Sequence, residues 1–309
     1  MRSAGAILLV AFLLVPWILP AYGLQVGIQA VILAIYAISF NLLFHQTGLL
    51  SFGHAAFFGA SAYTTALAMS KLGWPYLATL PLSLGVAALF ALLIGFSSVR
   101  LTRIYFTMLT LAFAQILWAV VHKWYAFTGG DNGITGLRPG GLLANATGLY
   151  YLALTMLAVV AGLLYKVLLS PAGYTLRAVR DNPARAEAIG ISSFEYALAA
   201  FVLSGTLSGV AGFLQVAWQG SVFPDLLFWT TSAEVIIATI LGGSRYFLGP
   251  VVGAIVLVVA RAVVQSHTEY WPLALGIVLL ALVLFFPAGV VGLFDRVRRR
   301  QESEEDAAA

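Results

Sequence analysis

The stretch between Arg2 and Lys71 contains no aspartate, glutamate, lysine or arginine. A transmembrane helix needs about 20 apolar residues, so this stretch is long enough for about three crossings of a bilayer. The rest of the chain has the same character, because only 9% of its 309 residues are charged and 61% are hydrophobic. Soluble domains carry about a quarter charged residues. The chain is therefore predicted to be an integral membrane protein.

Lipid offers no hydrogen-bond partners to the backbone, so the spans of such a chain are expected to be helices. We predict an all-α bundle of about ten transmembrane helices, some of them broken or re-entrant. The segment 229–243 is short for a span and is either a half-helix or a re-entrant piece. The expected spans are 5–22, 24–44, 50–70, 77–98, 104–122, 148–169, 194–217, 229–243, 247–265 and 271–288.

Residues 1–295 are expected to form a single membrane domain, and the charged tail 296–309 is expected to be disordered. The first apolar stretch is expected to be a transmembrane helix rather than a signal peptide cleaved near Ala21–Gly23, because two further uncharged spans follow it directly.

Basic residues predict the orientation. Arg100 and Arg103, the arginines of 177–185, Arg245 and the arginines of 296–300 all fall on one side of the expected spans. The positive-inside rule makes that side cytoplasmic and places both termini there. Lys71, Lys123 and Arg138 then lie outside as a minority.

The segment RAVRDNPARAEAIGIS, residues 177–192, concentrates charge in a chain that has little. Asn182 suits a helix N-cap, Pro183 the first helical position and Gly190 a left-handed stop, so a two-turn helix is predicted over 183–189. The spacing of Asp181 and Arg185 permits an ion pair. From the residues alone, the segment is either a solvated loop whose arginines fix topology or a helix that docks on a cytoplasmic partner.

The same segment resembles the coupling loop of ABC importer permeases, with Glu187, Ala188 and Gly190 matching its core. The whole chain resembles the permease family of the branched-chain amino acid importers, the LivM type. The further matching motifs are GLLSFGHAAFFGASAY (48–63), RLTRIYFTMLTLAFAQ (100–115), TGGDNGITGL (128–137), SAEVIIATILGG (232–243) and LGPVVGA (248–254).

The resemblance implies a transport subunit that is not itself an enzyme and needs no cofactor. Its implied partners are a second permease subunit, two cytoplasmic ATP-binding subunits and an extracytoplasmic solute-binding protein. Consistent with this, the sequence lacks the glycine-rich phosphate loop with its lysine. The coupling residues implied by the resemblance are Arg177, Arg180, Asp181, Asn182, Pro183, Arg185, Glu187 and Gly190.

Polar residues within the expected spans are candidates either for the solute path or for contacts between helices. They are Asn41, Ser51, His54, Gln115 and Glu234. An unpaired carboxylate at membrane depth costs several kcal/mol. Glu234 is therefore expected to pair with Arg245 or Arg261, or to cap a broken helix at 230–241.

The turn-rich segment 128–141 is either a simple connector or, as the resemblance implies, an external surface for the binding protein. Asp131, Asn132 and Arg138 would make contacts there. The four histidines show no metal-ligand spacing, and the absence of cysteine excludes thiolate chemistry.

The resemblance leaves the solute open between branched-chain or other small hydrophobic amino acids and urea, short amides or other small organic molecules. An ion-coupled secondary transporter would need paired membrane carboxylates, and only Glu234 qualifies. An intramembrane enzyme would need a nucleophile and base or a catalytic dyad, and no such motif is found.

Overall fold

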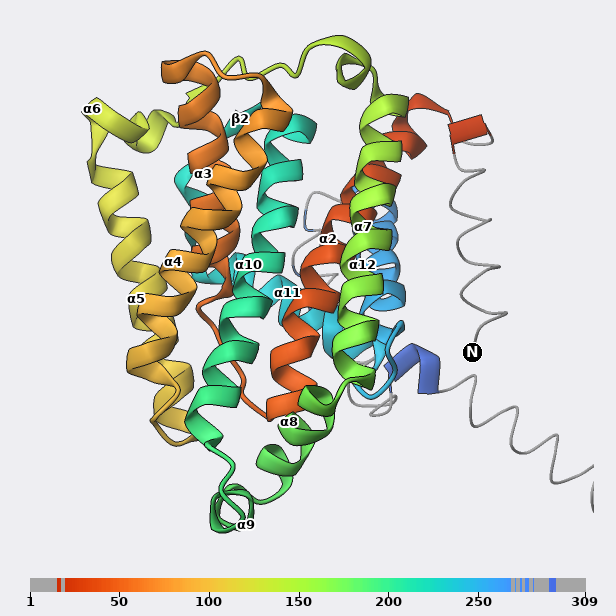
Figure 1. Cartoon of the computed structure of the whole chain (residues 1–309). Helices are drawn as coiled ribbons and strands as arrows, with labels where there is room; N and C mark the ends of the chain where they lie inside the picture. The colour runs from red at the N-terminus through yellow and green to blue at the C-terminus, as the bar shows by residue number, and fades with distance from the viewer. Residues whose placement is uncertain are drawn as a thin grey trace, which may run out of the picture.

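The computed structural model describes residues 16–17, 20–267, 270, 273, 276–277, 280 and 289–292. These residues form an almost entirely helical bundle, as predicted (Figure 1). The expected span 5–22 lies mostly outside the described residues. Most of 271–288 and the whole tail 296–309 lie outside them too.

Each expected span between residues 24 and 265 corresponds to one long helix. The long helices are α2 (Ala21–Thr47), α3 (His54–Leu72), α4 (Leu80–Ser98), α5 (Arg103–Lys123), α7 (Ala146–Leu169), α10 (Ser193–Gln219), α11 (Trp229–Gly242) and α12 (Gly249–Gln265). Among the described residues, five helical segments are long and apolar enough to cross a membrane: α2, α4 with its preceding turn η1 (Tyr76–Thr79), α5, α7 and α10.

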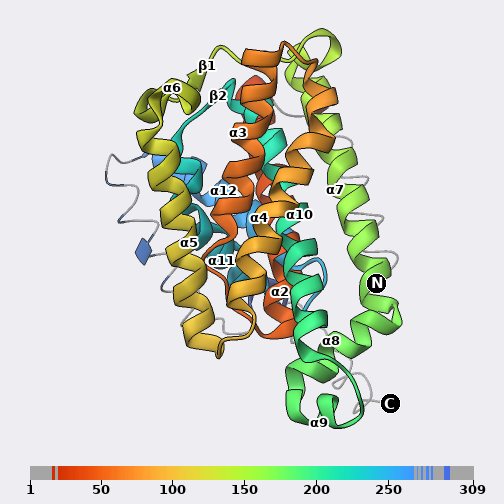
Figure 2. The ribbon, with the colours of Figure 1, turned by 60° about the vertical axis from the view of Figure 1, so that its left-hand side comes forward.

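Shorter elements occupy the two ends of the bundle. At one end lie α8 (Pro171–Asp181) and α9 (Pro183–Ala188). At the other end lie α6 (Tyr125–Thr128), the 3-10 turns η2 (Gly130–Asn132) and η3 (Gly141–Ala144), and the strands β1 (Ile134–Thr135) and β2 (Ser221–Val222). The 3-10 turn η4 (Pro224–Leu227) follows β2 and packs on α3 at Gly59, inside the bundle. The strands pair antiparallel, with Ile134 opposite Val222. Figures 1 and 2 show α9 and β2 at opposite ends in both views.

Helix α2 is the centre of the bundle. In its most apolar stretch 83% of the residues are buried, against 17% for α5. It packs against α7, α10, α11 and α12. Because α2 is apolar all round rather than on one stripe, its sequence is typical of a helix enclosed by other helices.

The prediction that the span 50–70 is helical from its first residue is wrong. Helix α2 ends at Gly48, whose φ is +71°, and α3 begins only at His54. The intervening segment is held by side chains: Thr107 Oγ1 donates to the Leu50 carbonyl at 2.7 Å, and Ser51 Oγ accepts from Gly53 N at 3.1 Å. Because other elements satisfy its backbone, this non-helical segment is tolerated within the bundle.

Helices α11 and α12 are shorter than the ~20 residues of a typical span. Their 14 and 17 residues correspond to about 21 and 26 Å, below the ~30 Å of a hydrocarbon core. Their backbones touch at glycines: a Cβ on Gly242 would overlap the Gly249 carbonyl, and one on Gly253 would overlap the Ala238 carbonyl. The segment 229–243 is therefore a short helix packed backbone to backbone on the next one.

Candidate functional site at the α8–α9 end

Helix α9 is the two-turn helix predicted from the sequence, ending one residue earlier at Ala188. Asn182 Oδ1 accepts from Arg185 N at 2.9 Å, so the predicted N-cap is formed. Gly190 follows with φ +85°. Between residues 181 and 190 only Ala186 is buried. Ile189 is 72% exposed at the tip, which leaves an apolar side chain without cover.

Helix α8 was not predicted. It is amphipathic, with Leu176 and Val179 buried three residues apart and polar residues on the other side. Gly173 allows close packing, because a Cβ there would lie 2.6 Å from the carbonyl oxygens of both Val167 and Leu168. The apolar pair Leu176 and Val179, at helical spacing, is the signal that could have revealed the helix.

Arg180 joins α8 to the end of the central helix. Its Nη1 donates to the His45 carbonyl at 2.7 Å, in the last turn of α2. Its Nε and Nη2 each lie 2.9 Å from Asp181 Oδ1, which fixes the guanidinium in place. A cation is favourable at a helix C-terminus, where unsatisfied carbonyls point outward. Arg180 thus provides a hydrogen-bonded link from α8 to α2.

The ion pair that the spacing of Asp181 and Arg185 permits is not formed. Asn182 has φ −156° and ψ 94°, so the helical conformation is interrupted between α8 and α9. The i, i+4 rule applies only within one helix, so the spacing brings no contact here. Asp181 pairs with its neighbour Arg180 instead.

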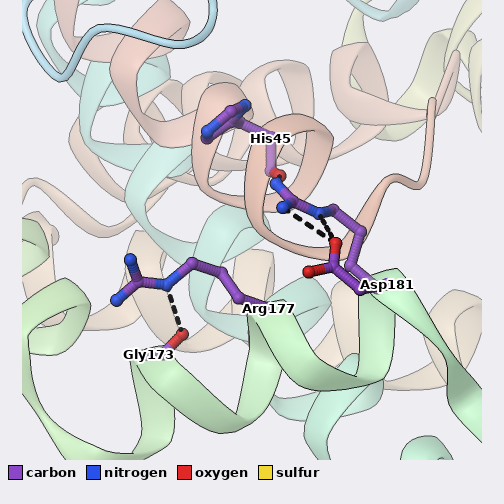
Figure 3. Close-up of polar contacts among 5 residues, drawn as sticks. His45, Gly173, Arg177 and Asp181 are labelled. Carbon is purple, nitrogen blue, oxygen red and sulfur yellow. Dashed lines mark hydrogen bonds and ion pairs between the residues drawn. The ribbon is translucent and has the colours of Figure 1, made fainter.

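Arg177 lies on the same helix and points along α8 (Figure 3). Its Nε donates to the Gly173 carbonyl and its Nη2 to the Leu168 carbonyl, each at 3.2 Å. Its guanidinium stacks on the Tyr174 ring at 4.5 Å. Arg177 therefore covers the last turn of α7.

Other basic residues belong to this end as well. Arg100 stacks on the rings of Phe96 and Phe194 at 4.7 and 4.5 Å, which ties the α4–α5 turn to the start of α10. Arg245 follows α11 and lines a cavity together with His45 and Arg177, and it is not the residue that pairs with Glu234. The described arginines predicted to share one side thus gather at the α8–α9 end, and those of 296–300 lie outside the described residues.

Glu234 is paired within the bundle. Of its two candidate partners the structure places Arg261 beside it, with Nη2 2.7 Å from Oε1. The side chains are 29% and 20% exposed. Glu234 also borders a cavity of about 90 Å³. The other polar residues of that cavity are Gln29, Tyr36, Gln215 and Thr231.

His54 is a packing residue of the core. Its Nε2 lies 2.8 Å from Ser204 Oγ, and that hydroxyl donates to the Ser39 carbonyl at 2.7 Å. The imidazole is enclosed edge-on by Phe40, Phe57 and Phe201. The hydroxyl chain ties α2, α3 and α10 together, and the sequence pattern did not reveal it.

Two further predicted polar residues lie apart from α9. Asn41 Nδ2 donates to the Ser244 carbonyl at 3.1 Å, which connects α2 to the turn between α11 and α12. Gln115 Nε2 is buried and has no hydrogen-bond partner among the described residues. The structure therefore does not bring the intramembrane candidates together at one point.

The predicted external residues lie at the end opposite α9. His122 Nδ1 is 3.7 Å from Asp131 Oδ1, and Asn132 belongs to the adjacent turn η2. Arg138 borders a cavity of about 370 Å³ together with Gln25 and Trp218. In the searched part of the chain, no three acidic or histidine side chains could hold a metal ion.

Comparison with known proteins identifies a family. The profile described as "Branched-chain amino acid transport system / permease component" matches residues 23–286. The high-affinity branched-chain amino acid transport system permease proteins LivM of Salmonella typhimurium and Escherichia coli are each 28% identical over 303 residues. These alignments cover 89% of this chain and 71% of each relative.

A second kind of relative matches a shorter region. The probable branched-chain amino acid transport permease protein LivH of Methanocaldococcus jannaschii is 30% identical over 146 residues. This alignment covers 42% of this chain and 43% of that protein.

Proposed function

The chain belongs to the branched-chain amino acid transport permease family and is the permease subunit of an ABC importer. On that premise we propose that it moves branched-chain or other small hydrophobic amino acids across the cell membrane by alternating access. The names of the LivM and LivH relatives support this class of solute. Hydrolysis of ATP belongs to separate partner subunits.

The observation that carries this proposal is α9. It is a capped helix at the far end of the bundle, exposed except at Ala186, and it presents an uncovered Ile189. A helix of six residues is too short to be stable alone, so it needs a surface to lie against. We assign that surface to a groove on an ATP-binding subunit, which Ile189 enters and whose rim Arg185 and Glu187 contact.

Transmission follows from the contacts of α8. When ATP binding draws the two ATP-binding subunits together, α9 is displaced and α8 moves with it. Arg180 carries the displacement to the last turn of α2 through the His45 carbonyl. Packed interiors resist compression, so α2 passes the movement to the helices that surround it. The coupling role thus belongs to the segment from Arg177 to Gly190.

The remaining partners follow from the two ends of the molecule. The arginine-rich α8–α9 end is assigned to the cytoplasm by the positive-inside rule, and both termini with it. The opposite end, with Asp131, Asn132 and Arg138, then receives the solute-binding protein, which sets solute selectivity. A second permease subunit completes the path.

The test is reconstitution of the permease with its ATP-binding subunits in proteoliposomes, with binding protein and labelled leucine outside. We expect uptake that requires ATP and the binding protein. Uptake driven by a proton or sodium gradient without ATP would contradict the proposal. Competition by unlabelled urea or acetamide, but not by leucine or valine, would reassign the solute.

Docking on α9 is tested separately by co-purification. Ile189→Asp places a charge in the contact, so it should abolish retention of the ATP-binding subunits. Leu142→Asp is the matched control, because Leu142 is 85% exposed at the opposite end. If both variants keep the ATP-binding subunits, α9 is not the docking helix.

A further inference from the structure

A cavity of about 250 Å³ lies where α7 ends and α8 begins. Its walls come from α2, α7, α8 and the turn between α11 and α12. The polar side chains among them belong to Asn41, His45, Gln46, Tyr165, Tyr174, Arg177, Ser244 and Arg245. The coupling mechanism acts through Arg180, three residues from Arg177 on α8, and gives no role to the space inside this cavity.

The cavity is strongly basic. Arg177 and Arg245 both line it, and in the described part of the chain neither has an acidic partner. Arg177 is half-buried and directs two of its nitrogens to backbone carbonyls, whereas Arg245 is exposed. The nearest described carboxylate on α8, that of Asp181, is engaged by Arg180. Two unneutralised guanidinium groups facing one cavity favour an anion, and phosphate is one of the anions whose geometry matches their planar forks.

The inner wall offers hydrogen-bond acceptors rather than donors. Asn41 is 8% exposed, and its amide orientation is fixed because Nδ2 donates to the Ser244 carbonyl. Its Oδ1 is therefore a buried acceptor, without a partner among the described residues. Gln46 Oε1 is likewise buried and has no hydrogen-bond partner among the described residues. Such acceptors cost free energy unless a donor reaches them.

The outer rim of the cavity has side chains that are typical of a site at the membrane surface. It includes Tyr165, Leu168, Leu169 and Tyr174, which lie where the apolar helix α7 ends and the polar helix α8 begins. Leu169 and Tyr174 are 58% and 61% exposed. Exposed tyrosines are typical of the headgroup level, and exposed leucine suits acyl chains. Basic pockets between helices at this level hold lipid headgroups.

We propose that this cavity binds the headgroup of a membrane phospholipid whose phosphate is held by Arg177 and Arg245 and which donates a hydrogen bond to Asn41. The donor requirement selects headgroups of the ethanolamine or glycerol type. Choline has no N–H or O–H group and would leave the amide oxygens unpaired. A bound headgroup would brace α8 against α2 and α7, next to the link made by Arg180.

The binding test uses the purified full-length permease and needs neither ATP nor solute. The protein is incubated with equal amounts of phosphatidylethanolamine, phosphatidylglycerol and phosphatidylcholine, and retained lipid is measured by native mass spectrometry. We expect the two donor-bearing lipids to be retained in preference to phosphatidylcholine. Equal retention of all three would overturn the role given to Asn41.

Variants locate the site. Arg245→Gln should weaken retention about tenfold, as expected for the loss of one charge-assisted contact. Arg245 makes no described contact that folding needs, so this variant should keep the wild-type unfolding temperature. Arg245→Lys should restore most of the binding, because a phosphate accepts a point charge. Arg138→Gln, at the opposite end, is the matched control and should bind as wild type does.

Competition separates a lipid site from other anion sites. Excess inorganic phosphate or free leucine should not displace the retained lipid. Displacement by phosphate would make this a site for small anions, and displacement by leucine would make it a solute site, so either result overturns the lipid assignment. Lipid retention is measured without transport, so the two proposals can fail independently. A loss of selective retention would not contradict the importer proposal, and a lack of ATP-driven uptake would not contradict lipid binding.

Discussion

The Arg180 side chain binds two partners at once, a carboxylate and a backbone carbonyl. Its guanidinium donates to Asp181 through two nitrogens and still has Nη1 free for the His45 carbonyl. Lysine carries the same charge but cannot keep this planar fork. A test of Arg180 should therefore keep the positive charge and change the geometry of the side chain.

We predict that Arg180→Lys lowers uptake in proteoliposomes severalfold while the ATP-binding subunits stay bound and still hydrolyse ATP. The physical reason is that α9 remains intact but its displacement no longer reaches α2. The measurement is the number of solutes carried per ATP hydrolysed. An unchanged ratio would mean that the movement reaches the bundle by another route. Arg100→Lys, at the same end but stacked on phenylalanines, serves as control.

The Glu234–Arg261 ion pair leads to a second prediction about individual residues. Both side chains are less than a third exposed. Removing one charge therefore leaves the other poorly solvated. Glu234→Gln and Arg261→Gln should each lower the unfolding temperature, and the double variant should recover part of the loss. We expect a coupling free energy of about 1–3 kcal/mol from this double-mutant cycle in detergent. Strictly additive losses would show that the pair contributes nothing.

At the scale of elements, the contact between α11 and α12 is the most sensitive to size. A methyl group on Gly253 would overlap the backbone of Ala238 and Gly242. Gly253→Ala should therefore separate the two helices and destabilise the protein by about 1–3 kcal/mol or more. Gly162, in α7, has nothing within 4 Å of the corresponding position. Gly162→Ala should be neutral or stabilising by up to about 1 kcal/mol. Thermal unfolding of the two variants compares them, and equal midpoints would contradict the packing described.

The long helices could be predicted from sequence because apolar length is a local property. The expected span 148–169 corresponds to α7, which begins at Ala146, and 194–217 corresponds to α10, which begins at Ser193. The cap at Asn182 was predictable for the same reason, since it involves only neighbouring residues.

What could not be predicted depends on contacts between distant residues. The segment before His54 looks like helix, but Thr107 and Ser51 hold it open. Nothing near residue 180 in the sequence points to the carbonyl of His45. Helix α8 was missed because Pro171 and Gly173 are typical of a loop, whereas Gly173 serves here for close packing.

At the scale of the whole molecule, the orientation in the membrane can be tested directly because the chain has no cysteine. Ile189→Cys and Leu142→Cys place single thiols at exposed positions on opposite ends. A thiol reagent that does not cross membranes, applied to intact cells, should label Cys at residue 142 and not at residue 189. After the cells are opened, both should react. Labelling of residue 189 from outside would invert the proposed topology.

The enclosure of α2 has a consequence for how the gene tolerates variation. A helix with a lipid-facing side can exchange one apolar residue for another there, since any hydrocarbon surface satisfies the bilayer. Helix α2 has almost no such side, because protein surrounds it along most of its length. A saturation mutagenesis library selected for uptake should therefore be depleted at nearly every codon from Ala30 to Leu43, with no periodic gaps, whereas α5 should accept substitutions on its open side.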